Sequence, residues 1–330
     1  MKLMRIIGAA LLCSLFLLGT GSALPTPDEW RSTAAGGFSA LTEEEAASFI
    51  RPLVENNITS GIIVVLVDQS GYTWYAYGDL STPSDSCPAN QTLFDIGSIS
   101  KVMTGLLMAD AEERGGYNIS APVSTWLPAA YRLPGYEGIE ITGADLATHR
   151  SGLPVTPDSF AMLDPTLTHA DLVEASVRHY QTMTADETYA WLSNTSLLGP
   201  PGYEALYSNL GGAIAGDSVA RAEGRPYPEL FRERITVPLG LGDTAAAWSR
   251  EDLERRAVGH RGYAYPADDA RLIMFNGFWT ATGGVHSSAD DMAVFLAENL
   301  GLVDTPLATA IDKTHRPRAI TWQSPLLMEQ

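Results

Sequence analysis

Strand-forming sequence is concentrated in one short stretch, and this most limits what the chain can fold into. Residues 62–67 are a β-branched run bounded by Gly61 and Gly71, and residues 72–77 follow after a turn. Together they predict an antiparallel hairpin. From about residue 118 to 244 the sequence instead shows helical segments punctuated by proline and glycine. This order predicts an α/β (α+β) fold: an antiparallel sheet flanked by helices, and a helical lobe across a cleft.

Helices are predicted on both sides of the hairpin. Thr42 and Glu45 form a capping box, which predicts a helix over residues 43–55. A second helix is predicted over residues 98–113, and its apolar residues fall on one face, so we expect it to pack into a core. That face consists of Val102, Leu106, Leu107 and Ala111.

The later part of the chain is expected to return to the sheet. A helix is predicted over residues 210–222, and residues 272–275 are a candidate strand. Gly283 and Gly284 predict a turn, and Ser288 is placed to cap a helix that runs to Leu300. We therefore predict an α/β lobe from about residues 41–115 and 265–330, and a helical lobe from about residues 116–264.

The N-terminus has the pattern of an export signal. Lys2 and Arg5 precede an apolar run over residues 6–18 that is too short to span a membrane comfortably. We expect residues 1–23 to be a cleaved signal peptide and residues 24–330 to be the mature domain, exported to the periplasm, the cell surface or the medium. An uncleaved N-terminal anchor is the alternative. Cleavage would leave Cys87 as the single cysteine, so no internal disulfide is expected.

The charge of the chain excludes some partners. The formal net charge of the 330 residues is −18, which disfavours binding to nucleic acid or to anionic lipid. No partner protein is indicated, and we expect a small-molecule or peptide substrate. Lysine is scarce, with Lys2, Lys101 and Lys313 the only ones in the chain.

Ser98 and Lys101 form an S-x-x-K sequence at the start of the second predicted helix. Residues three apart lie on the same helical face, so the lysine amine can reach the serine hydroxyl and take its proton if burial keeps the amine neutral. The helix N-terminus adds an unpaired N–H that can face an oxyanion. The alternative is that Ser98 only caps the helix and Lys101 lies in solvent.

Tyr207 and Asn209 form the one Y-x-N sequence of the chain, just before the helix predicted over residues 210–222. A tyrosine at this junction can relay a proton near the serine, and the asparagine amide can hold a substrate carbonyl. A turn tyrosine and an N-cap asparagine are the alternative reading of the same residues.

Four segments, in order along the chain, resemble the motifs of the class C β-lactamase and D,D-peptidase family. Their shared features are the S-x-x-K serine, an H-x-S-G-L-P sequence, a P-G segment ending in Y-S-N, and a G-G turn followed by D-M. They are residues 94–101, 146–154, 201–209 and 282–292. The resemblance implies a β-lactamase/transpeptidase-like fold and a serine hydrolase that cleaves amides or esters through an acyl-enzyme.

The same resemblance implies a role for each site residue. Ser98 would be the acylated nucleophile and Lys101 its general base or proton relay. Tyr207 would assist proton transfer to the leaving group and activate the deacylating water, while Asn209 would bind the acyl side-chain amide. His149, in the H-x-S-G-L-P segment, is expected to pack and form hydrogen bonds rather than catalyse.

Other hydrolytic mechanisms lack their signatures. The histidines show no H-x-H-x-D grouping, so we predict no zinc or other metal and no cofactor. The chain also lacks the G-x-S-x-G of an α/β-hydrolase. A β-lactamase, a D,D-carboxypeptidase and an esterase remain open, because they share this catalytic set.

The third motif of the family, K-T-G or H-[TS]-G on a strand, is not found. Lys313, Thr314 and His315 come nearest, but they fit a solvated helix end better. That strand would supply a second oxyanion donor, whose loss alone lowers the rate by about 10²–10³. We therefore expect a C-terminally truncated member that hydrolyses little or nothing. An inactive remnant that acts as a binding protein is the alternative function.

Overall fold

A computed structural model describes residues 24–27, 29–30, 41–80, 87–157, 166, 168, 171, 178–257, 275 and 277–318. The predicted signal peptide and the first three residues of the candidate strand over 272–275 lie outside these residues, and residue 275 is in neither helix nor strand. The α-helices are α3 (Glu43–Glu55), α4 (Ile99–Glu113), α5 (Gly143–Ala147), α7 (Ala185–Leu192), α8 (Asn209–Ala222), α9 (Tyr227–Phe231), α10 (Arg250–Glu254), α11 (Thr280–Gly283), α12 (Ala289–Asn299) and α13 (Ala308–Thr314). The strands are β1 (Gly61–Asp68), β2 (Gly71–Gly78), β3 (Phe94–Asp95) and β4 (His286–Ser287). The remaining elements are the 3₁₀ helices η1 (Ala89–Gln91), η2 (Val123–Trp126) and η7 (Gly277–Trp279), and the π-helices η4 (Arg178–Thr182) and η5 (Arg232–Thr236).

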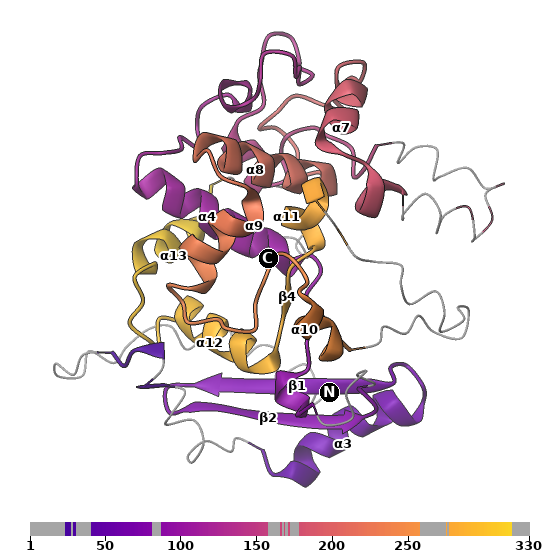
Figure 1. Ribbon diagram of the computed structural model, residues 1–330, viewed down its shortest axis with the longest axis vertical. Helices are drawn as coiled ribbons and strands as arrows, with labels where there is room; N and C mark the ends of the chain where they lie inside the picture. The colour runs from indigo at the N-terminus through magenta and orange to yellow at the C-terminus, as the bar shows by residue number, and fades with distance from the viewer. Residues whose placement is uncertain are drawn as a thin grey trace.

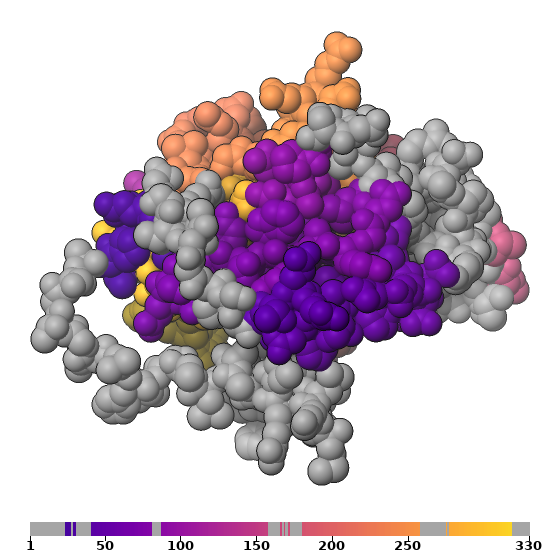
Figure 2. Space-filling view, turned by 90° about the horizontal axis from the view of Figure 1, so that it is seen from below, coloured from indigo at the N-terminus to yellow at the C-terminus, as the bar shows by residue number. Residues whose placement is uncertain are grey.

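The predicted hairpin is confirmed. Strands β1 and β2 pair antiparallel along their full length, with Val64 opposite Tyr75. The hairpin lies between α3, which packs on β2, and α12, which packs on β1 (Figure 1). Figure 2 looks onto this end of the molecule, where α3 and the hairpin, in indigo and purple, face the viewer. Contact with helices on both faces partly buries the hairpin, and every residue of β1 is of intermediate exposure.

The predicted helix boundaries hold closely. Helix α3 begins at its capping box, in which Thr42 accepts the Glu45 amide and the Glu45 carboxylate accepts the Thr42 amide. Helix α12 is capped by Ser288, as predicted. Helix α8 starts at Asn209, and its N-cap is Ser208 rather than the asparagine.

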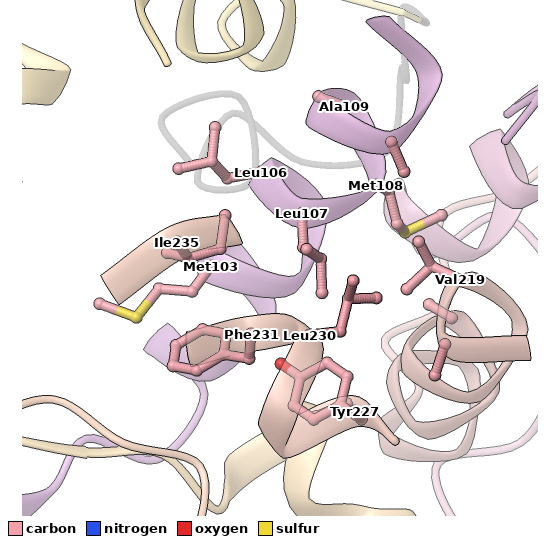
Figure 3. Close-up of a cluster of buried hydrophobic side chains, with 14 of the residues drawn as sticks. Met103, Leu106, Leu107, Met108, Ala109, Val219, Tyr227, Leu230, Phe231 and Ile235 are labelled. Carbon is pink, nitrogen blue, oxygen red and sulfur yellow. The ribbon is translucent and has the colours of Figure 1, made fainter. Parts of the chain in front are cut away.

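Helix α4 runs through the centre of the helical part and carries much of its core. Its buried residues Met103, Leu107 and Met108 point toward α8, α9 and η5 (Figure 3). Residues from those elements complete the cluster: Val219, Tyr227, Leu230, Phe231 and Ile235. This packing holds the N-terminus of α4 firmly relative to the rest of the molecule.

One residue of the predicted core face of α4 was placed wrongly. Leu106, Leu107 and Ala111 are buried, but Val102 is 53% exposed. Met103, the next residue, takes the buried position instead. Both residues are apolar, so the spacing alone could not decide which one is buried.

Two short strands join the hairpin end of the chain to the C-terminal part. Strand β3 pairs antiparallel with β4, placing Phe94 opposite Ser287 and Asp95 opposite His286. The Ile96 amide extends this contact by donating to the Val285 carbonyl at 3.0 Å. The segment just before Ser98 is thereby fixed beside the segment that follows α11. The predicted division into two lobes stays a prediction.

No helix in the described part of the chain is long and apolar enough to cross a membrane.

Candidate active site

Ser98 is presented at the N-terminus of α4 with its side chain free to react. It occupies the N-cap position in helical backbone geometry, yet its hydroxyl makes no capping bond. The next three amides donate to the carbonyls of residues 96, 97 and 98. The Ser98 N–H itself has no acceptor among the described residues. The side chain is exposed, so a substrate can reach both the hydroxyl and this N–H.

Lys101 reaches Ser98 from one turn further along α4. Its Nζ donates to Ser98 Oγ at 3.1 Å and to the Thr282 carbonyl at 2.7 Å. Burial lowers the pKa of Lys101 to about 8. The alternative of a solvated lysine is therefore wrong. An amine with this pKa has an appreciable neutral fraction near neutral pH, as a general base requires.

Tyr207 approaches Ser98 from the irregular segment before α8. Its hydroxyl lies 2.6 Å from Ser98 Oγ, and its ring centroid is 4.9 Å from Lys101 Nζ. The side chain is 45% exposed. The structure thus brings together three groups that the sequence predicted from two separate motifs: the hydroxyl and amine of S-x-x-K and the phenol of Y-x-N.

Asn209 lies two residues beyond Tyr207, at the first turn of α8. Its Nδ2 donates to the Tyr180 hydroxyl at 2.9 Å, which leaves the amide oxygen for other donors. The Tyr180 ring packs against the Phe275 ring, with centroids 4.2 Å apart. It also forms a T-shaped contact with the Trp279 ring, with centroids 5.5 Å apart. Burial raises the pKa of Tyr180, so its hydroxyl stays protonated. No motif in the sequence points to Tyr180.

Helix α11 lies against α4 beside the site, and two of its carbonyls accept hydrogen bonds from α4 side chains. Thr104 Oγ1 donates to the Ala281 carbonyl at 2.7 Å, one residue before the carbonyl that accepts from Lys101. The Val285 amide donates to the buried Ser100 hydroxyl at 3.1 Å. The sequence placed Thr282 inside a family segment but gave it no role. Its contact with Lys101 joins residues 181 apart, which no local pattern reveals.

The sequence nearest to a third motif is a helix end, as predicted. Lys313 and Thr314 belong to α13, and His315 is its C-cap. Lys313 Nζ pairs with Glu112 at 3.0 Å and also with Glu113, both at the end of α4. This lysine therefore ties α13 to α4 at the opposite end from Ser98.

Known proteins share this arrangement of elements. A class C beta lactamase from Rhodobacter sphaeroides superimposes with a TM-score of 0.63 and 26% identity, covering 82% of this chain and 70% of that one. A beta-lactamase/D-alanine carboxypeptidase from Yersinia pestis, solved with citrate, superimposes with a TM-score of 0.60 and 25% identity. This match covers 77% of this chain and 68% of that one. The fold is thus of the β-lactamase/transpeptidase type.

The sequence comparisons agree with the fold. A family model described as Beta-lactamase matches residues 46–326, and the chain belongs to this family. It is 29% identical over 273 residues to the D-alanyl-D-alanine-carboxypeptidase/endopeptidase AmpH of Escherichia coli K12, covering 81% of this chain. It is 26% identical over 277 residues to a Beta-lactamase of the same strain, covering 83%. The chain spans 66% of the length of each of these two relatives.

Proposed function

We propose that the protein is a serine hydrolase that cleaves amide or ester bonds through an acyl-enzyme on Ser98. The observation that carries this proposal is the contact of an exposed Ser98 Oγ with Tyr207 at 2.6 Å and with a partly buried Lys101 at 3.1 Å. A nucleophile within hydrogen-bond reach of a base, which is itself held by a third group, is the arrangement that nucleophilic catalysis requires. Here the third group is the Thr282 carbonyl.

The chemistry divides into two steps, and we expect their turnover to be slow because the sequence lacks the third motif and the second oxyanion donor that it would supply. Neutral Lys101 takes the Ser98 proton as Oγ attacks the substrate carbonyl, and the oxyanion that forms faces the Ser98 N–H. Tyr207 then passes a proton to the departing amine or alcohol, which leaves an ester on Ser98. In the second step the deprotonated Tyr207 takes a proton from water as the hydroxide attacks the ester, the acid product leaves, and the departing Ser98 oxygen regains its proton from Lys101.

The substrate class follows from the relatives and from Asn209. The relatives are named for D-alanyl-D-alanine carboxypeptidase and beta-lactamase activity, so a D-Ala-D-Ala-like peptide or a β-lactam is the favoured substrate. The free amide oxygen of Asn209 suits an N–H of the acyl side chain, which such substrates carry. Small esters would use the same catalytic groups.

Covalent labelling tests the proposal directly. A fluorescent penicillin and a fluorophosphonate should each form an adduct that peptide mapping assigns to Ser98. Ser98→Ala should abolish both adducts, and Tyr207→Phe should slow the penicillin adduct by about 10²-fold, because the departing amine of this probe takes its proton from Tyr207. Ser70→Ala, in the exposed turn of the hairpin, is the matched control and should label normally. A folded protein that forms no adduct at Ser98 with either probe would exclude the function.

The pH dependence of labelling tests the role of Lys101. Because burial lowers the pKa of this amine to about 8, its neutral, basic form grows as the pH rises through that value. The labelling rate should therefore increase about tenfold from pH 7 to 9 and then level off. Lys101→Arg, whose side chain stays protonated, should abolish labelling at Ser98 and with it the pH dependence. A rate that is flat over this range would contradict a base of pKa about 8.

Export completes the proposal. The positive N-region and apolar run of residues 1–23 support cleavage before Leu24 and an extracytoplasmic location. N-terminal sequencing of the protein from the native host checks this, since a protein that still begins at Met1 would contradict cleavage.

A further inference from the structure

His149 occupies a backbone position that usually holds glycine. Helix α5 ends at Ala147, and the backbone of His149 takes a φ of 56°. The Arg150 amide closes the turn by donating to the Asp145 carbonyl at 2.7 Å. This left-handed geometry favours glycine or asparagine, because it crowds a Cβ atom. A histidine is tolerated here only where its side chain makes contacts that offset the strain.

Those contacts hold three consecutive residues of the segment that carries Tyr207. The His149 carbonyl accepts the Leu206 amide at 2.7 Å, and its Nδ1 accepts the Ser208 amide at 3.2 Å. Between these two bonds the imidazole packs on the Tyr207 ring, with centroids 4.4 Å apart and the planes tilted by 40°. His149 thus forms hydrogen bonds to the residues on both sides of Tyr207 and packs against the Tyr207 ring itself.

Tyr207 depends on such support. It lies in a segment without helix or strand, and nearly half of its surface is exposed. Other bonds that hold the segment run from the Gly202 amide to the Arg150 carbonyl at 2.7 Å and from Ser208 Oγ to the Pro154 carbonyl at 2.6 Å, and neither contacts the Tyr207 ring. The 2.6 Å contact between the phenol and Ser98 needs the ring held in one position, because proton transfer is sensitive to displacements of about 1 Å.

The contacts of His149 leave it no direct part in proton transfer. An Nδ1 that accepts an amide N–H carries no proton, so the ring is in the neutral state. Burial first, and then the charge of Lys101, lower the pKa of His149 to about 4, which keeps it neutral over the working range. Its polar atoms contact the backbone beside Tyr207 rather than Ser98.

We propose that His149 is a positioning residue that sets the Tyr207 hydroxyl against Ser98, a role that rests on the proposed acyl transfer. It acts through Tyr207 alone. Its removal should therefore have no effect on the rate once the Tyr207 hydroxyl is gone, and this separates positioning from a general contribution to folding.

The test is a double-mutant cycle on the rate at which the fluorescent penicillin labels Ser98, because the amine freed from this probe takes the Tyr207 proton. His149→Gly removes the ring and relieves the strained backbone, so the melting temperature should hold or rise while labelling slows by about 10- to 100-fold. His149→Asn tolerates the same φ and keeps an acceptor for Ser208, so it should be intermediate. His149→Gly combined with Tyr207→Phe should label no more slowly than Tyr207→Phe alone.

Glu137→Gly is the matched control, because Glu137 also has a left-handed backbone (φ 49°) but lies exposed in a remote turn. It should gain stability without any change in labelling. Three results would overturn the proposal: labelling of His149→Gly within twofold of the wild type, losses that multiply in the double variant, or losses that follow the melting temperature.

Absence of labelling in the wild type would refute the proposed function. The positioning role of His149 would then be tested by a second measurement, the NMR signal of the Tyr207 ring. With ring-¹³C tyrosine, the Tyr207 resonance is identified by its loss in Tyr207→Phe. His149→Gly and His149→Asn should both shift it, and Glu137→Gly should not. An unshifted resonance in the folded His149 variants would overturn the positioning role.

Discussion

Gly212 leaves the space that Lys101 occupies. A Cβ atom at this position of α8 would lie 2.6 Å from Thr282 Oγ1 and 3.2 Å from Lys101 Cε. Glycine in a helix interior costs about 1 kcal/mol relative to alanine, so a larger residue would be favoured here if there were room. The glycine lets α8 pass close behind the lysine and the carbonyl that holds it.

Gly212→Ala should therefore impair the site although alanine is the better helix former. Displacing Lys101 from Ser98 should slow labelling by about 10²-fold, measured as a second-order rate constant. Gly105→Ala in α4 is the control, since its Cβ would meet nothing within 4 Å. It should stabilise the protein by up to about 1 kcal/mol and label at the normal rate. Normal labelling of Gly212→Ala would mean that the lysine does not depend on this space.

At the scale of elements, Asp291 ties α12 to the chain before α10. Its buried carboxylate accepts the Asp243 amide at 2.7 Å and the Thr244 hydroxyl at 2.8 Å. The adjacent Ala245 exchanges two backbone bonds with His286 of β4. Helix α12 also packs on β1, so this carboxylate helps to hold the hairpin against the helical part.

Asp291→Ala should destabilise the fold by about 3 kcal/mol, because it removes the buried carboxylate that accepts from the half-buried Asp243 amide and from the buried Thr244 hydroxyl. Urea unfolding measures the effect. Asp312→Ala is the comparison, as Asp312 is exposed on α13 and pairs with the exposed Arg316. It should change the free energy of unfolding by less than about 0.5 kcal/mol. Equal changes in the free energy of unfolding for the two substitutions would contradict the role of Asp291 in holding α12 to residues 243 and 244.

What the sequence could predict depends on how local the cause is. The hairpin, the capping box of α3 and the cap of α12 follow from neighbouring residues, and all three were predicted correctly. Ser98 and Lys101 were found because helical spacing alone brings them together. Thr282 and Tyr180 were not found, because their roles arise from packing between distant segments. The burial of Met103 in place of Val102 has the same origin.

The whole molecule carries a formal charge of −18, which affects how charged substrates approach Ser98. An anionic substrate is repelled at long range, and salt screens that repulsion over a Debye length of about 10 Å at 0.1 M. Labelling by an anionic penicillin should therefore accelerate on the order of threefold from 10 to 300 mM NaCl. A neutral ester probe should show no such rise. A penicillin rate that falls with salt would indicate local attraction at the site instead.

The reactive cluster draws Ser98 from α4, Tyr207 from the segment before α8, and the Thr282 carbonyl from α11. No single stretch of the chain contains enough of it to react, so a partly folded molecule or a proteolytic fragment would carry an ordinary, inert serine. With Ser98 as the proposed nucleophile, the number of serines labelled by a covalent probe should therefore equal the number of chains in which all three segments have come together. The site can serve as an internal titration of correctly folded protein in a refolded or stored sample.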